Sequence, residues 1–69
     1  MNAVLLEFED LLARKPAEVC KVLGLPYSTY AGYRASADPI PASVYLHINA
    51  LRRLDAATLH ELVRERVRG

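Results

Sequence analysis

The sequence predicts an all-α protein, a compact domain of five helices that spans residues 1–69. Apolar residues recur at three- and four-residue spacing in successive segments, which is the period of a helix with one buried side. No segment alternates apolar and polar residues as a half-buried strand does. Proline, glycine or a short polar residue separates the segments, as is typical of helix ends. A chain of this length has room for one domain only.

The first helix is predicted to begin after Asn2, because an asparagine side chain can cap the free N–H groups of a first turn. Its buried stripe contains Val4, Leu5, Phe8, Leu11 and Leu12. Glu7 and Asp10 lie on the opposite, solvated side, and Asp10 has the spacing to pair with Arg14. Arg14 and Lys15 follow the stripe, where cations stabilise the negative end of the helix dipole.

Pro16 is predicted to open a second, short helix, because its missing N–H would have no partner in a first turn. The buried side of this helix is formed by Val19, Val22 and Leu23. Gly24 follows as a left-handed stop, a backbone conformation that glycine adopts at low cost. Pro26 then restarts a third helix, which carries Tyr30 and Tyr33.

Residues 37–41 are predicted to form a loop, because two prolines flank one apolar residue there. Pro41 opens the fourth helix, whose stripe is formed by Val44, Tyr45, Ile48 and Leu51. Asp55 is expected to cap the fifth helix, whose buried side is formed by Leu59, Leu62, Val63 and Val67.

The composition restricts the classes of function and partner. Nine Lys and Arg against eight Asp and Glu give a net charge of +1, whereas a dedicated nucleic-acid binder is usually strongly basic. The apolar runs are too short to cross a membrane and the N-terminus lacks a signal-peptide pattern, so a cytoplasmic location is expected. A single cysteine excludes an internal disulfide. Because so small a domain is marginally stable alone, we expect a homodimer.

The sequence contains no catalytic or metal-binding pattern. Cys20 is interpreted as a small, packed core residue; the alternative is a redox thiol, for which no neighbouring base is evident. His47 and His60 have no partners at catalytic or metal-ligand spacing. There is no Ser/His/Asp set, phosphate-binding glycine loop or carboxylate pair. We therefore expect no enzymatic activity, no metal and no cofactor.

Residues 16–33 read PAEVCKVLGLPYSTYAGY and resemble the helix-turn-helix of phage Cro and lambda-type repressors. The resemblance extends through residues 38–41, DPIP, and covers about half of the chain. It implies that the second and third helices form the motif, with Cys20 at their close approach and Gly24 in the turn. The third helix would then be anchored on the core by Leu25, Tyr30 and Tyr33.

In that family the second helix of the motif lies in the major groove, and its first residues touch base edges. The outward positions here are Tyr27, Ser28, Ala31 and Gly32. Base reading normally uses Arg, Lys, Asn or Gln, and none of these occupies an outward position. Arg34 is the only cation of the third helix, and the candidates for phosphate contacts are Lys21, Arg52 and Arg53.

The C-terminal segment carries Arg64, Arg66 and Arg68, interleaved with Glu61 and Glu65. The first interpretation is a solvated helix face on which these charges form helical ion pairs. The alternatives are contacts to phosphate groups or a seam between two copies of the chain.

The first function hypothesis is a protein-binding inhibitor, such as an anti-activator that captures a DNA-binding transcription activator of a bacterial host. Some small phage proteins with this kind of scaffold capture host proteins. The predicted contact residues are Glu7, Asp10, Tyr27, Ser28, Ala31 and Arg34. An exposed tyrosine beside small residues is common in protein-binding surfaces, and the two acidic residues would attract a basic partner. The simpler interpretation of Glu7 and Asp10 is a solvated helix face.

The alternative hypothesis is a Cro- or repressor-like transcriptional regulator that binds an operator as a homodimer. The resemblance of the motif and the arginine-rich C-terminus favour this alternative. The readout positions favour the protein-binding inhibitor, because they carry no side chain that reads bases.

Overall fold

Five α-helices and no strand make up the computed structural model, which describes all 69 residues and confirms the all-α prediction. The helices are α1 (Ala3–Leu12), α2 (Pro16–Leu23), α3 (Tyr27–Ala35), α4 (Ala42–Arg52) and α5 (Ala56–Arg68). No helix is both long and apolar enough to span a membrane.

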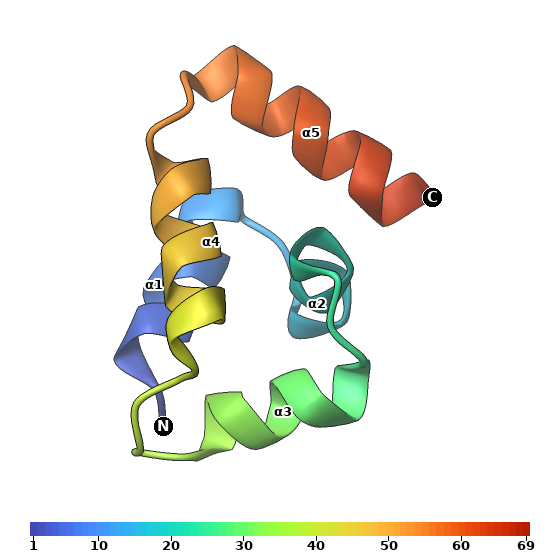
Figure 1. Cartoon of the computed structure of the whole chain (residues 1–69). Helices are drawn as coiled ribbons and strands as arrows, with labels where there is room; N and C mark the ends of the chain where they lie inside the picture. Colours follow the sequence, from blue (N-terminus) through green and yellow to red (C-terminus); the bar gives the residue numbers. More distant parts are fainter.

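The second helix lies at the centre of the arrangement and contacts each of the other four. In Figure 1 it lies between α3 on one side and α5 on the other, with α1 and α4 beside it. The buried apolar side chains form one cluster: Leu5, Phe8, Leu12, Val19, Cys20, Val22, Leu23, Tyr30, Val44, Ile48, Leu51, Leu59 and Val63. Since α3 contributes only Tyr30 to this cluster, most of α3 is left at the surface.

Local capping rules place the helix starts. Asn2 Oδ1 accepts hydrogen bonds from the N–H groups of Val4 and Leu5 at 3.1 and 3.3 Å, as predicted. The Asp55 side chain caps α5 through the N–H and the hydroxyl of Thr58, at 3.2 and 2.6 Å. These hydrogen bonds from Thr58 also hold the pKa of the Asp55 carboxyl below its usual value.

Prolines lie at three helix starts, as predicted, but in two different positions. Pro16 is the first residue of α2 as expected, whereas Pro26 and Pro41 are the N-caps of α3 and α4. Both have extended backbone, with ψ of 145° and 144°. In this conformation the carbonyl of each proline accepts the first hydrogen bond of its helix, from Tyr30 and Tyr45 respectively.

The end of the first helix differs from the prediction. The backbone turns left-handed at Ala13, with a φ of 54°, directly after the last helical residue. Arg14 therefore lies beyond α1, where it no longer has the helical geometry to reach Asp10. It pairs with Glu18 of α2 at 3.1 Å instead. The expected Asp10–Arg14 pair is wrong because the helix stops two residues too early.

Some residues at the edges of the predicted apolar stripes are more exposed than expected. Leu11 and Tyr45 were expected inside, but they are 49% and 45% exposed. Val4, Leu62 and Val67 are half-buried and pack against the core, as does Tyr33. A residue at the margin of an amphipathic stripe is buried only if a neighbouring helix covers it, and the spacing of apolar residues does not contain that information.

Gly24 and Ala13 both have left-handed backbone, and substitutions at the two positions are predicted to change the free energy of unfolding in opposite directions. Gly24, with a φ of 71°, has no atom within 4 Å of the position a Cβ would take, so Gly24→Ala strains only the backbone. We expect it to lower the free energy of unfolding by about 1 kcal/mol. Ala13→Gly should raise it by about 0.5 kcal/mol, because the strain at that position is removed. Urea denaturation followed by circular dichroism checks both signs, and two shifts in the same direction would contradict the prediction.

Candidate partner-binding site on the third helix

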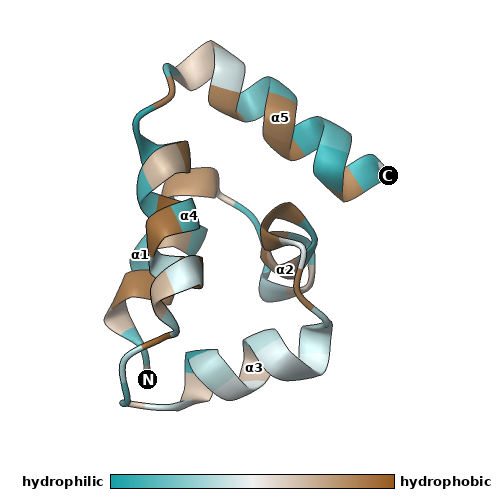
Figure 2. Ribbon diagram, in the orientation of Figure 1, coloured by the Kyte–Doolittle hydropathy of each residue, from teal (hydrophilic) through white to brown (hydrophobic).

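The outward side of α3 is a small, uncharged surface. Tyr27 is 56% exposed, and Ser28 and Gly32 are also exposed, whereas Ala31 is half-buried. In Figure 2 this helix is pale over most of its length, whereas the other helices carry strongly apolar segments. The surface therefore offers one aromatic ring and small polar groups.

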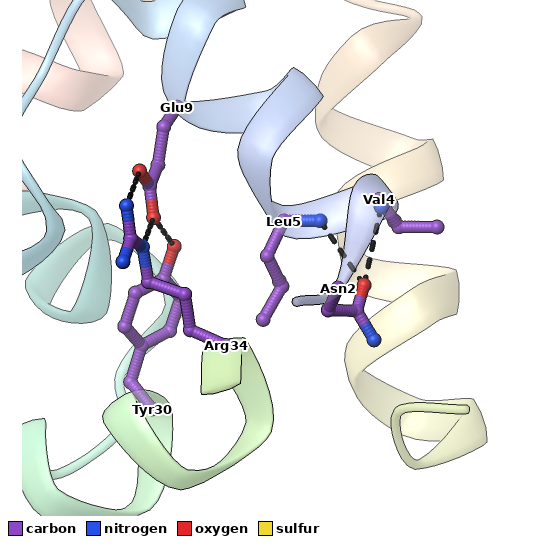
Figure 3. Close-up of polar contacts among 6 residues, drawn as sticks. All are labelled: Asn2, Val4, Leu5, Glu9, Tyr30 and Arg34. Carbon is purple, nitrogen blue, oxygen red and sulfur yellow. Dashed lines mark hydrogen bonds and ion pairs between the residues drawn. The ribbon is translucent and has the colours of Figure 1, made fainter. Parts of the chain in front are cut away.

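A buried cluster of three side chains joins α3 to α1 (Figure 3). The Tyr30 hydroxyl donates to Glu9 Oε2 at 2.6 Å. Arg34 donates to the same carboxylate twice, from Nε to Oε2 at 2.8 Å and from Nη2 to Oε1 at 3.2 Å. This two-pronged geometry is the strongest form of an arginine–carboxylate pair.

Burial and hydrogen bonding raise the pKa values of two side chains of this cluster, Tyr30 and Arg34. Burial raises the pKa of Tyr30 well above its usual range, and the hydrogen bond to Glu9 raises it further. The hydrogen bond to Glu9 also raises the pKa of Arg34. Both shifts favour the protonated forms of Tyr30 and Arg34, which are the forms that donate to Glu9.

The cluster determines which charges α3 presents. The Arg34 side chain is only 30% exposed and the Glu9 side chain 9%, so the positive charge is directed toward α1 and balanced there. Arg34 is the only cation between Tyr27 and Ala35. The outward surface of α3 consequently carries no free positive charge.

A shallow groove runs along α3 and the loop that follows it. It is lined by Ser28, Thr29, Gly32, Tyr33, Ser36, Asp38, Pro39, Ile40 and Pro41. Asp38 is the only charged residue among them. Asn2, the N-cap of α1, holds both parts of this groove in place: its Nδ2 donates to the Asp38 carbonyl of the loop at 3.2 Å, and its N–H donates to the Arg34 carbonyl near the end of α3 at 2.9 Å.

The acidic residues predicted to contact a partner lie on the neighbouring helix. Glu7 and Asp10 are both exposed on α1. Asp10 lines a surface hollow of mixed charge, which also contains Glu9, Glu18, Arg14 and Lys15. Glu9 reaches α3 from the same helix, whereas Glu7, two residues earlier, lies on the other side of α1 and is not brought beside the surface of α3.

The candidates for phosphate contacts are dispersed. Lys21 is exposed and lines a hollow with Gly24, His47 and Arg66 at the end of α2. Arg52 and Arg53 are exposed at the C-terminal end of α4, at the opposite end of the molecule from α3 in Figure 1. The structure therefore does not gather Arg52 and Arg53 beside the outward surface of α3.

Glu9 is the residue that the sequence analysis missed. It lies four residues after Leu5, one after Phe8 and three before Leu12, which places it inside the buried stripe of α1. A charge at a stripe position must find a partner when it is buried. That signal is present in the sequence, although the partner lies 25 residues away.

Cysteine and histidine form no further site. Cys20 is buried, and its thiol donates to the Ala17 carbonyl at 3.1 Å. Arg66 Nη1 lies 3.1 Å from His47 Nε2, whereas His60 is exposed. No group of three or more His, Cys, Asp and Glu residues is placed to hold a metal ion.

Comparisons with known protein families, curated proteins and solved structures find no match to this chain.

Proposed function

We propose that this chain is a non-enzymatic regulator that inhibits another protein by binding it through the outward surface of α3. The observation that carries the proposal is the pairing of Arg34 with the buried Glu9. A helix that reads DNA needs donors for base edges and cations for phosphates, and this surface offers neither beyond small hydroxyl groups. An exposed tyrosine among small residues suits a protein partner better.

The scaffold of the proposal is a helix-turn-helix formed by α2 and α3. Three residues, Gly24 to Pro26, connect the two helices, and the left-handed Gly24 provides the turn. Cys20 and Tyr30 are buried in the common core. These features agree with the resemblance to small phage regulators, which in turn suggests a partner in the cytoplasm of a bacterial host.

The partner is proposed to present a basic surface, as a DNA-binding transcription activator does. Glu7 and Asp10 are exposed on α1, and Asp38 is the only charge along the groove beside α3. An acidic group beside a neutral contact surface, as Asp38 is here, steers a basic partner toward it and disfavours acidic ones. An inhibitor of this kind, an anti-activator, would occupy the surface that the activator uses for DNA.

Operator binding as a homodimer is the second candidate. It is favoured by the proposed scaffold and by the exposure of Lys21, Arg52 and Arg53. In this case the contacts would be mainly to phosphates, because α3 has no side chain suited to reading bases.

Titration of labelled mixed-sequence duplex DNA separates the two candidates. We expect no binding in fluorescence anisotropy at low salt or at physiological salt. Binding at low salt that falls steeply as salt rises would favour the operator-binding candidate, because phosphate contacts release counterions. Loss of that binding in Ser28→Ala, whose side chain is exposed, would locate it on α3.

Capture of a partner tests the surface itself. The immobilised protein and its Tyr27→Ala variant are compared in a bacterial lysate, with Tyr45→Ala as the matched control. Both tyrosines are about half exposed, but Tyr45 lies on α4. We expect a transcription activator to be retained by the wild type and the control and to be lost at least ~tenfold with Tyr27→Ala. Equal retention by all three proteins would contradict a role of the α3 surface.

A further inference from the structure

The outward side of α5 carries four charges without partners in the chain. Glu61, Arg64, Glu65 and Arg68 are all exposed. The two ion pairs of the structure are Arg14–Glu18 and Glu9–Arg34, so the helical ion pairs expected along α5 are not formed.

The orientation of α5 is fixed by its other side. Leu59 and Val63 are buried in the core. Arg66, which was expected among the helical ion pairs, donates to the Val22 carbonyl of α2 at 2.6 Å. The charged side of α5 is therefore held outward, where it lines a surface hollow together with Arg14 and Val67.

The signs and the spacing of the four charges make α5 complementary to an antiparallel copy of itself. Along the chain the order is acid, base, acid, base at positions 61, 64, 65 and 68. Read from the other end, with the same spacing, the order is base, acid, base, acid. A second α5 placed antiparallel to the first would thus face Glu61 with Arg68, and Arg64 with Glu65, in both directions.

We propose that α5 is the seam of a homodimer in which two copies of the chain lie antiparallel along this charged stripe. Alternating signs match neither the uniform negative charge of a nucleic acid nor a purely acidic or basic peptide, whereas they match a second copy. Two-fold symmetry requires a surface that is complementary to itself, and this stripe meets that requirement. The inference does not depend on the function proposed for α3.

Charge reversal tests the seam. One variant carries Glu61→Arg and Glu65→Arg, and the other carries Arg64→Glu and Arg68→Glu. Each variant alone sets four like charges against four like charges, so its dimerisation should weaken at least ~tenfold in sedimentation velocity. An equimolar mixture should form a heterodimer, because opposite charges again face each other. Wild-type dimerisation should weaken as salt rises.

Several outcomes would overturn the proposal: a wild-type chain that stays monomeric at all concentrations, a reversed variant that dimerises as the wild type does, or a mixture that stays monomeric. Arg52→Glu with Arg53→Glu, at the C-terminal end of α4, is the control and should dimerise normally. Circular dichroism verifies that each variant is folded. If a double variant is unfolded, Arg64→Glu and Glu65→Arg, which face each other in the seam, are mixed in the same way.

Discussion

Tyr30→Ala is expected to lower the free energy of unfolding by about 4 kcal/mol. Tyr30 is fully buried, with 0% exposure, and it is the only buried residue of α3. Its removal leaves a cavity between α3 and the core and takes one donor away from the buried Glu9 carboxylate. A domain of this size has a total stability on the order of 3–10 kcal/mol, so much of the population should be unfolded. Urea denaturation followed by circular dichroism measures the loss.

Two matched variants separate packing from hydrogen bonding at this position. Tyr30→Phe keeps the ring and removes the hydroxyl, and its cost should be about 1–2 kcal/mol. Tyr27→Ala, in the same helix but exposed, should change stability by less than about 0.5 kcal/mol. Equal costs for Tyr27→Ala and Tyr30→Ala would show that α3 is not anchored as described.

Glu9→Ala is the second substitution with a large expected effect, a loss of about 3 kcal/mol in the free energy of unfolding. It leaves the buried Tyr30 hydroxyl without its acceptor and removes both hydrogen bonds that hold Arg34. Glu9→Gln should cost less, because an amide oxygen can still accept from one of the two donors. Thermal and urea unfolding curves of the three proteins give this order.

The control for Glu9 lies on the same helix. Glu7 is exposed, so Glu7→Ala should change stability by less than about 0.5 kcal/mol. In a double-mutant cycle, Tyr30→Phe should cost less in the Glu9→Ala background than in the wild type, since its acceptor is already absent. Additive effects would mean that the two side chains act independently, which the 2.6 Å hydrogen bond contradicts.

Local chemistry made most of the fold predictable. Asn2 and Asp55 cap their helices with their own side chains, and Gly24 supplies a left-handed stop, so these three boundaries are specified by local sequence. The Asp10–Arg14 pair failed for a local reason, the end of α1 at Leu12, whereas the failures in predicted burial had a tertiary cause. Leu11 and Tyr45 have apolar side chains at helical spacing, but no neighbouring helix covers them fully.

The candidate site was predictable only in part. Ser28 is exposed because it lies opposite the buried Tyr30 on α3, whereas Tyr27 is exposed because it lies at the very start of the helix. The place of Arg34 does not follow from its own helix, because it depends on a carboxylate contributed by α1. A pairing between Glu9 and Arg34 could be anticipated only by asking why an acid interrupts an apolar stripe.

The cluster of Glu9, Tyr30 and Arg34 limits how the surface of α3 could be transferred to another protein. The helix has nine residues, fewer than the roughly 12–15 that an isolated helix needs for even marginal stability in water. A synthetic peptide with its sequence would therefore not present the surface. A graft onto another helical scaffold would also need a carboxylate in the place of Glu9. Without it, Arg34 would turn outward, and the graft would display a positive charge where the parent protein displays none.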